Sequence, residues 1–387
     1  MNSETPLRAE NLRIHNKNLV LSLIYQQQAA GISQSIIVDQ TGLKAPTIFR
    51  IFNELQADEV IEPVAVSADE SPAAKKGRRP VNFRVRRTAR YSIAVEFWTA
   101  YISIGVFDFW GERIQSIIQN LKPDMTADGI TEIITSSIRS IIWTLDIPIE
   151  KIMGVGVAAP GQVDLSKKVI TYYPRIKGMQ DYPVVTKLQQ SLQIPVILHN
   201  NCSALAVGEF RYGKFDTGGS LFTFLLRSGV NGSFINNDMV YLNSRHQTIE
   251  AGHIPILMDG PACTCGKKGC LEACLKSLDR NSPDTAMMFS SLNAGSPEFP
   301  VIMNKAAGYL AAAVNMIAQI LSPSAYLIVA CNDGVASALA GYLQNRIQKD
   351  CFTTRLPVVY HAGYDPLFTQ RGISDQVIAN YFFEETI

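Results

Sequence analysis

The segment EAGHIPILMDGPACTCGKKGCLE, residues 250–272, is the most informative part of this chain. It contains four side chains of the kinds that bind metals, namely His253, Cys263, Cys265 and Cys270. An imidazole and three thiolates form a closed tetrahedral site, which leaves no position for a water molecule. The pattern therefore predicts a zinc ion with a structural role rather than a hydrolytic one. A set of buried free cysteines is the alternative.

The composition is that of a folded protein with more than one domain. The chain has 387 residues, of which 47% are hydrophobic and 18% charged, so disorder is excluded as its global state. At roughly 150 residues per domain, this length predicts two or three domains. The start of the chain has no apolar leader, no apolar run is unbroken enough to span a membrane, and the seven cysteines do not suggest a secreted disulfide framework. We expect a cytoplasmic protein with no membrane partner.

Residues 10–63 read as short helices, two of which are separated by a tight turn. The pattern predicts one helix over Ser33–Gln40, with Ser33 as its N-cap, and another over Ala45–Asp58. Gly42, in the turn between them, is able to adopt the positive φ that such a turn needs. This order is typical of helix-turn-helix DNA-binding modules. An ordinary three-helix cap is the alternative.

The second helix of this pair would be the one that reads DNA. Its apolar stripe leaves four residues for the groove-facing side, namely Lys44, Pro46, Thr47 and Arg50. Lys44 and Arg50 are suited to phosphate or guanine, and Thr47 to a base edge or a thymine methyl group. The sequence therefore predicts double-stranded DNA as a partner.

A basic segment follows the helical module, inside a stretch of residues 64–80 that reads as a linker. The segment KKGRRP contains Lys75, Lys76, Arg78 and Arg79. Two arginines between Gly and Pro form an extended arm suited to a narrow minor groove. A solvated run of charges is the alternative, but the position, where the wing of a winged helix would lie, favours DNA contact. We expect residues 1–80 to be a winged helix-turn-helix domain with a basic arm.

From Tyr91 the pattern changes to strands that alternate with helices. The hairpin predicted over residues 91–108 resembles the one predicted over 220–242, and each begins a stretch that ends in a helix and a further strand. Two such halves suggest a duplicated α/β protein with a cleft between two lobes. Two unrelated hairpins are the alternative.

Together these features resemble the ROK family of repressors, open reading frames and sugar kinases, in particular its NagC/Mlc/XylR-type repressors. The most specific match is Glu250–His253 followed by the cysteine segment Cys263–Glu272. The resemblance implies an actin-like domain of two α/β lobes over residues 81–387, with His253, Cys263, Cys265 and Cys270 as zinc ligands. In the family's repressors a winged helix-turn-helix precedes this domain.

The resemblance also implies a sugar-binding cleft. Family positions that contact sugar correspond to Gly161, Asn200, Asn201, Glu250, His253 and Glu272 in this chain. Gly161 lies in an Ala-Pro-Gly turn, and the two asparagines lie in a motif that joins a strand to a helix. A sugar or a sugar phosphate is therefore the expected effector.

Several departures from the family's kinases argue against phosphoryl transfer. The kinases read Asn-Asp-Ala-Asn where this chain has Asn200–Ser203, so the catalytic base is replaced by Asn201, whose amide has no useful basicity. Their first phosphate loop, Asp-x-Gly-Gly-Thr, is Glu96–Ala100 here, and Trp98 would fill space that glycine leaves for phosphate. The second loop, Ser228–Gly232, keeps only two glycines, and Ala330–Asn332 replaces a late Gly-Gly pair.

These features predict a non-enzymatic regulator, a repressor of carbohydrate metabolism genes that is controlled by a sugar. It would act as a homodimer or homotetramer, because two recognition helices must reach successive major grooves about 34–36 Å apart. An ATP-dependent ROK sugar kinase is the first alternative. A regulator that has lost its sugar and responds to a protein partner is the second.

Overall fold

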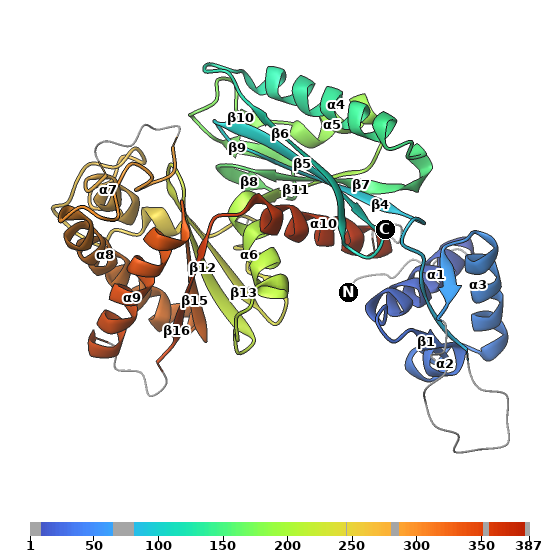
Figure 1. The fold of residues 1–387 in the computed structure, drawn as a ribbon. Helices are drawn as coiled ribbons and strands as arrows, with labels where there is room; N and C mark the ends of the chain where they lie inside the picture. Colours follow the sequence, from blue (N-terminus) through green and yellow to red (C-terminus); the bar gives the residue numbers. More distant parts are fainter. Residues whose placement is uncertain (1–8, 65–80, 245, 280–285, 351–355, 384–387) are drawn as a thin grey trace, which may run out of the picture.

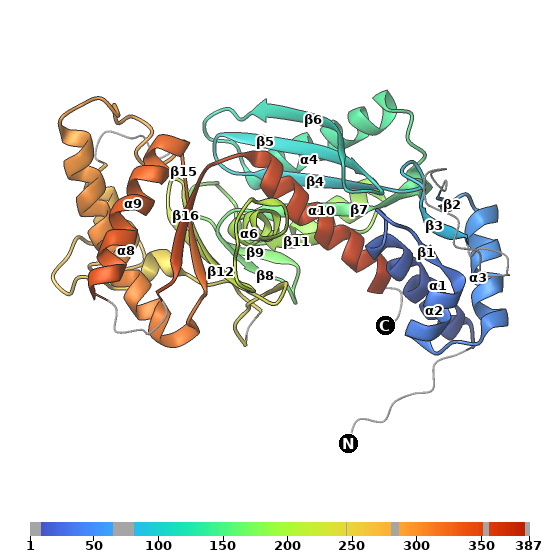
Figure 2. The ribbon, with the colours of Figure 1, turned by 60° about the horizontal axis from the view of Figure 1, so that its bottom comes forward.

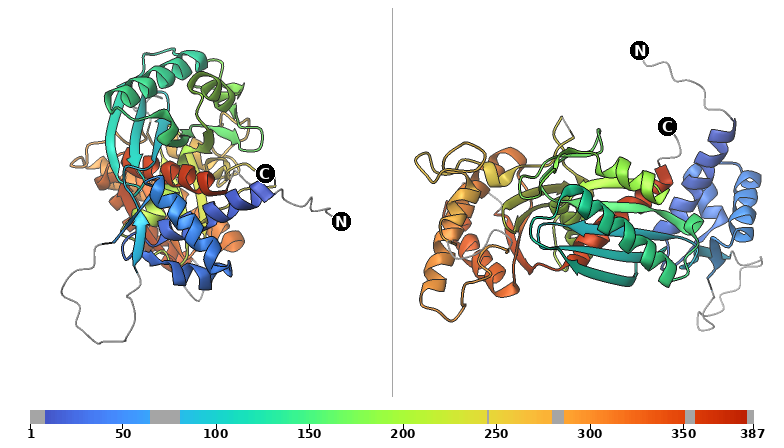
Figure 3. Two further views of the ribbon diagram at one scale, coloured as in Figure 1. Left: turned by 90° about the vertical axis from the view of Figure 1, so that its right-hand side faces the viewer. Right: turned by 90° about the horizontal axis from the view of Figure 1, so that it is seen from above.

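The computed structural model describes residues 9–64, 81–244, 246–279, 286–350 and 356–383. These residues form a small N-terminal domain and two α/β lobes (Figure 1). The N-terminal domain lies at one end of an elongated molecule and the second lobe at the other (Figure 3). The four basic residues predicted to form the arm, Lys75, Lys76, Arg78 and Arg79, lie outside the described residues.

The N-terminal domain is a winged helix-turn-helix, as the sequence predicts. Its elements are α1 (Ala9–Gln26), β1 (Ile32–Ser33), α2 (Gln34–Thr41), α3 (Ala45–Ala57), β2 (Ile61–Pro63) and β3 (Asn82–Val85). The strands form an antiparallel sheet in the order β1-β3-β2. Strand β3 therefore belongs to this sheet although it lies beyond residue 80, and we place the domain boundary after it.

Local signals set the two helices of the helix-turn-helix. Ser33 caps α2 by accepting a hydrogen bond from the backbone N–H of Ile36 at 3.5 Å. Gly42 ends that helix with φ +67°, and its N–H donates to the carbonyl of Val38. Helix α3 buries the predicted apolar stripe, namely Ile48, Ile51, Phe52 and Leu55. Both helices are thus confirmed close to their predicted bounds.

The two lobes share one sheet topology. The first sheet has the order β11-β7-β4-β5-β6 and the second the order β14-β13-β12-β15-β16. In each, the first three strands in sequence form an antiparallel meander, and the last two pair in parallel on the other side. The first sheet consists of β4 (Tyr91–Phe97), β5 (Tyr101–Asp108), β6 (Arg113–Asn120), β7 (Ile152–Ala159) and β11 (Val196–Asn200); the second of β12 (Ser220–Leu226), β13 (Val230–Asn236), β14 (Met239–Val240), β15 (Ala325–Ala330) and β16 (Val358–Gly363). The predicted duplication is therefore present.

Helices cover both sheets. In the first lobe α4 (Ala127–Thr144) and α5 (Val184–Leu192) pack on the outer face, and in the second lobe α8 (Glu298–Leu321) and α9 (Asp333–Asp350) do so (Figure 1). Helix α8 is long and apolar enough to cross a membrane by composition, but its buried residues belong to the core of the second lobe. A small sheet, β8 (Gln162–Asp164), β9 (Val169–Tyr172) and β10 (Gln180–Tyr182), extends the first lobe. Short helices are η1 (Ile149–Lys151), η2 (Ala251–His253) and α7 (Leu271–Lys276).

Two long helices lie between the lobes. Helix α6 (Asn201–Tyr212) follows the first sheet in sequence but packs on β12 and β13, and α10 (Pro366–Phe383) follows the second sheet but packs on β4 and β7 (Figure 2). They cross closely, because a Cβ atom on Gly208 would lie 1.9 Å from the carbonyl oxygen of Phe368. The two lobes are therefore joined by a tight crossing that only small residues permit.

The N-terminal domain shares a core with the first lobe. Apolar side chains of α1 pack with the C-terminal part of α10 and with residues at the base of the first sheet: Val20, Leu21, Ile24, Phe109, Met153, Val377, Ile378 and Phe382. The ring of Tyr25 lies 5.5 Å from that of Phe382 and 5.6 Å from that of Phe109. The winged helix-turn-helix is thus packed against the end of α10.

Candidate functional site

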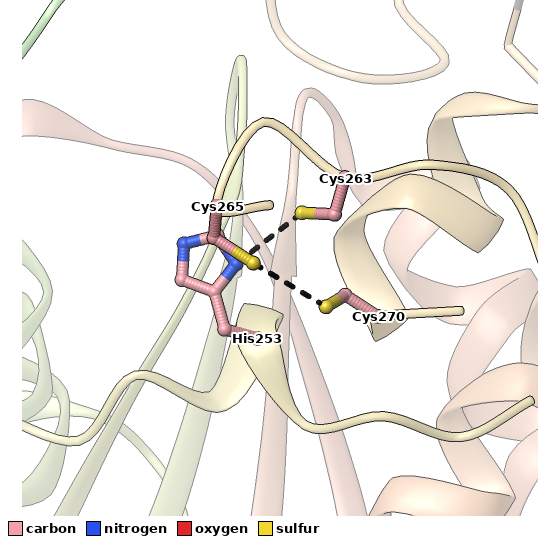
Figure 4. A group of neighbouring side chains, drawn as sticks. All are labelled: His253, Cys263, Cys265 and Cys270. Atoms are coloured by element: carbon pink, nitrogen blue, oxygen red, sulfur yellow. Dashed lines mark hydrogen bonds between the residues drawn. The ribbon is translucent and has the colours of Figure 1, made fainter. Parts of the chain in front are cut away.

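The predicted metal ligands lie together (Figure 4). The ligand atoms of His253, Cys263, Cys265 and Cys270 all lie within 4.8 Å of one another. Cys263 Sγ is 3.5 Å from His253 Nδ1, and Cys265 Sγ is 3.6 Å from Cys270 Sγ. These separations match the edges of a tetrahedron around a metal with bonds of about 2.0–2.3 Å to nitrogen and sulfur. The cluster therefore fits a tetrahedral metal ion.

The sequence places each ligand on a different local structure. His253 ends the short helix η2, Cys263 and Cys265 lie in the following loop, and Cys270 is the N-cap residue of α7. Burial and the neighbouring thiols raise the pKa of the Cys270 thiol to about 12. A cation is therefore needed to hold Cys270 as a thiolate near neutral pH.

A cleft of about 290 Å³ lies between the lobes and next to this cluster. Five of the six predicted sugar-contacting residues line it, namely Gly161, Asn201, Glu250, His253 and Glu272. His253 belongs to both sites, because its Nδ1 faces the cysteines while its ring also lines the cleft. A metal ion would therefore fix one wall of the cleft by orienting this ring.

Glu272 is held in the wall of the cleft by two contacts. Its Oε2 accepts a hydrogen bond from the N–H of Val230 at 3.0 Å, and its Oε1 lies 3.2 Å from Nζ of Lys276. Gly229 lets the carboxylate approach, since a Cβ atom there would lie 2.7 Å from Oε2. Glu250 lines the same cleft and is exposed.

The two predicted asparagines have different surroundings. Asn200 does not line the cleft: its Oδ1 accepts from the N–H groups of Cys202 and Ser203, which caps α6, and its Nδ2 donates to the carbonyl of Gly161 at 2.8 Å. Asn201 lines the cleft, and its Oδ1 has no hydrogen-bond partner among the described residues. Asn200 therefore shapes the cleft, and Asn201 is the residue available to a ligand.

A buried charged cluster that borders the cleft through Arg227 and Trp98 was not predicted from the sequence. Arg227, directly after β12, pairs through Nη2 with Glu96 at the end of β4. Tyr364, which precedes α10, donates to Glu96 at 2.5 Å, and Trp98 covers the guanidinium group of Arg227 at 5.0 Å. The available signal was an arginine directly after the apolar strand segment of residues 221–226, where a charge needs a partner.

The four residues of α3 that the sequence assigns to DNA contact lie at its start and differ in exposure. Lys44, at the N-cap position, and Pro46, in the first turn, are exposed, and Thr47 is half-buried. Arg50 is exposed, with Nε 4.0 Å from Glu54 Oε1. Phe49 is 57% exposed on the same helix. Phe49 was not among the predicted DNA contacts, because the pattern of apolar residues alone does not show whether a phenylalanine next to the buried stripe is exposed.

Residues 92–350 match the ROK family. The chain belongs to the ROK family. It is 26% identical to the xylose repressor of Bacillus spizizenii over 272 residues, which are 68% of this chain and 67% of that protein. It is also 33% identical to the glucokinase of Halalkalibacterium halodurans, over 122 residues that are 31% of this chain and 37% of the glucokinase.

Solved structures confirm the actin-like ROK fold. A ROK family transcriptional regulator, a homolog of the E. coli Mlc protein, superposes with a TM-score of 0.75 at 18% identity, and the match covers 97% of this chain and 99% of that one. A ROK family glucokinase from Streptomyces griseus, in complex with glucose and AMPPNP, gives a TM-score of 0.59 at 21% identity over 74% of this chain and 98% of that one. Of these two structures, the transcriptional regulator is the one that matches nearly the whole chain.

Proposed function

We propose that this ROK protein is a DNA-binding transcriptional repressor of carbohydrate metabolism genes that responds to a sugar. The observation that carries the proposal is the packing of a winged helix-turn-helix on a ROK domain in which Asn201 lines the cleft at the position of the kinase base. Similarity to xylose repressors over 68% of the chain supports it. We expect the protein to act in the cytoplasm as a homodimer or homotetramer.

DNA contact would be made by α3 and the wing. Lys44, Pro46, Thr47 and Arg50 present backbone-binding and base-reading groups on one exposed side of the helix. Phe49 adds an apolar surface suited to thymine methyl groups. Lys75, Lys76, Arg78 and Arg79 follow β2 and precede β3 in the sequence, and we propose that this basic segment contacts the minor groove.

Sugar would bind in the cleft. Glu250, Glu272 and His253 offer acceptors and a ring nitrogen that suit pairs of sugar hydroxyls. The Oδ1 of Asn201, which has no partner among the described residues, offers a further acceptor. Gly161 lines the cleft with backbone alone. Its φ is +74°, and a Cβ atom at this position would lie only 2.5 Å from the carbonyl oxygen of Tyr172, so no larger residue fits.

Zinc is the metal we propose for the cluster of His253, Cys263, Cys265 and Cys270, with a structural role. Because His253 lines the cleft, removal of the metal should loosen that wall. We predict that a chelator, or Cys265→Ser, lowers the affinity for the sugar under conditions in which operator binding is still intact. Metal content by elemental analysis, sugar affinity and DNA affinity are measured in parallel. Equal loss of both affinities would contradict the prediction and indicate general unfolding.

The kinase alternative is disfavoured by the contents of the cleft. Glu96–Ala100 and Ser228–Gly232, the segments that resemble phosphate loops, meet at a wall filled by Trp98 and Arg227. Backbone N–H groups must approach phosphates closely, and these side chains occupy the approach. An amide at Asn201 also lacks the basicity to take a proton from a sugar hydroxyl.

One experiment tests the proposal. The full-length protein is used to select duplexes from a random DNA pool, and the selection is repeated with a panel of sugars. We expect enrichment of a sequence with two half-sites and a sugar that changes the binding. A parallel assay of ADP release with ATP and the same sugars should show no turnover, whereas rates above about 1 s⁻¹, in the ordinary range of enzymes, would establish the kinase instead. Failure to enrich any duplex would refute the regulator.

A further inference from the structure

Helix α1 presents an apolar surface that lies outside the cores of the molecule. Three leucines, Leu12, Leu19 and Leu23, lie within an arc of about 40° on this helix, at 3.6 residues per turn. Leu12 is 48% exposed, and the other two are half-buried. Leu12 and Leu19 belong to none of the hydrophobic clusters that the described residues form, and Leu23 only borders that of the N-terminal domain. We call this surface the leucine face.

The charged residues of α1 all lie on its other sides. Arg13 pairs with Glu54 at 2.8 Å and Lys17 with Asp58 at 3.0 Å, so these two charges are turned toward α3 and its C-terminal end. Glu10, the third charged residue of the helix, lies about 160° around it from the centre of the leucine face. A helix face in water is normally polar or charged, so an exposed apolar face without charge indicates a partner.

The leucine face has the spacing of a coiled-coil seam. Leu12, Asn16, Leu19 and Leu23 follow one another in steps of four, three and four residues. These are the alternating steps between the d and a positions of a heptad, and Asn16 occupies an a position, where one polar residue fixes the register of two paired helices. In a parallel pair Asn16 meets Asn16 of a second copy, and each leucine meets its own copy. An antiparallel pair would instead bury this amide against a leucine, which leaves it without a hydrogen-bond partner.

We propose that the leucine face of α1 is a contact between two copies of this chain, which pair in parallel with Asn16 against Asn16. The pattern favours a second copy as the partner, because a twofold contact requires a surface that is complementary to itself. In both views of Figure 3 the start of α1 projects from the body of the molecule, where a second copy is able to reach it.

The inference rests on the proposed function and names the surface that would join two DNA-binding domains. Packed helices lie about 8–10 Å apart, and α3 packs beside α1 in each copy. Three such distances separate the two α3 helices by at most about 30 Å. Successive major grooves lie about 34–36 Å apart, so this contact holds both reading helices at nearly the spacing that DNA requires.

Analytical ultracentrifugation of the full-length, metal-loaded protein tests the contact. Leu12→Glu places two like charges against each other, so it should raise the dissociation constant of the pair about tenfold or more and halve the mass of the particle. Because Leu12 is exposed in the first turns of α1, the thermal midpoint of the separated chain should stay the same. Ile118→Glu, which changes an isoleucine that is 62% exposed on β6, is the matched control. A wild type that is monomeric with and without DNA, or a Leu12→Glu variant that associates like the wild type, would overturn the proposal.

A gain of association and a cross-link test the register. Asn16→Leu should strengthen the pairing about tenfold or more, because it removes the cost of a polar residue in the seam. Leu12→Cys should form a disulfide-linked dimer with oxidised glutathione, since position 12 faces its own copy in a parallel pair. The wild type, whose first cysteine is Cys202, is treated in the same way as the control. A link that forms only when Leu12→Cys is mixed with Leu23→Cys, or no link at all, would overturn the parallel pairing.

Selection of duplexes separates this contact from the proposed function. A monomeric protein that enriches a single half-site would refute the contact and keep the regulator. A protein that pairs through α1 but enriches no duplex would refute the regulator and keep the contact. An operator with two half-sites that Leu12→Glu binds as tightly as the wild type would show that the two DNA-binding domains are joined elsewhere.

Discussion

Glu209 is a carboxylic acid in a place where its ionisation is unfavourable. It lies on α6, is buried, and its Oε1 has no hydrogen-bond partner among the described residues. Burial and, to a smaller extent, the nearby charge of Asp365 together raise the pKa of this carboxyl to about 7. An ordinary glutamate has a pKa of about 4.3. At a pH between these two pKa values, Glu209 is therefore protonated in the folded protein but ionised in the unfolded chain.

We predict that this group makes the free energy of unfolding fall as the pH rises from about 4.5 to about 7, by an amount on the order of 3 kcal/mol. Its contribution is fully present below the pKa of the unfolded chain and is lost as the pH rises through the folded value. Glu209→Gln should therefore match the wild type in urea unfolding at pH 5 and exceed it at pH 8. The exposed Glu132→Gln serves as the control, and an unchanged pH profile in Glu209→Gln would contradict the assignment.

Arg50 carries a prediction about DNA. It is exposed on α3, and its contact with Glu54, at 4.0 Å, is weak enough to be exchanged for DNA. Arg50→Ala should lower the affinity for the selected operator by about 1–3 kcal/mol and leave sugar affinity unchanged. Arg139→Ala, which removes an exposed arginine from α4, is the matched control. Footprinting that shows no difference between Arg50→Ala and this control would refute the assignment of α3 as the reading helix.

Single residues also show where sequence reasoning ends. The metal cluster was predictable because its ligands and their spacing lie in one segment. Asn200 and Asn201 are neighbours in sequence, but only the structure shows that the first caps α6 and the second faces the cleft. Arg227 was missed because its partner Glu96 is distant in the chain and lies in the other lobe.

Among the elements, α6 and α10 depend most on small residues. A Cβ atom on Gly208 would lie 1.9 Å from the carbonyl oxygen of Phe368, so Gly208→Ala must push the two helices apart. We predict a loss of about 1–3 kcal/mol or more, seen as a lower thermal midpoint. Gly341→Ala in α9 is the opposite control, because no described residue has an atom within 4 Å of its Cβ position. There, alanine should stabilise by about 0.5–1 kcal/mol. Equal effects at both sites would disprove the close crossing.

Elements differ in how far the sequence determines them. Helices α2 and α3 could be predicted with their ends because Ser33, Gly42 and Pro46 act within one or two turns. The crossing of α6 and α10 could not, because each helix packs on the sheet of the other half of the chain. A glycine inside a helical pattern indicates a close approach but does not name the helix that approaches.

In the whole molecule, α10 connects the cleft to the DNA-binding domain. It begins two residues after Tyr364, which contacts Glu96 in the cleft wall, and its 18 residues span about 27 Å. Its last turns pack against α1 (Figure 2). The duplicated topology was predictable from the two similar hairpins. This connection was not, because it requires the last helix of the chain to meet the first one.

The packing of α10 against α1 predicts how the sugar signal travels. A ligand that disturbs Glu96 and Tyr364 can bias DNA binding only if α10 transmits the change, and coupling between two such sites is typically about 1–3 kcal/mol. Phe382, which lies between Tyr25 and Phe109, is the largest buried side chain that α10 contributes to that contact. Phe382→Ala should therefore reduce the change in operator affinity caused by the sugar, while sugar affinity without DNA stays the same.

The neighbouring Phe383→Ala is the matched control, since that ring is 61% exposed. Operator affinity is measured with and without the sugar that responds in the selection, and sugar affinity with and without the operator. Because coupling is reciprocal, both ratios must shrink by the same factor in Phe382→Ala. If both ratios stay at the wild-type value, the signal reaches the DNA-binding domain without α10. If the two ratios differ from each other, the variant has altered more than the coupling.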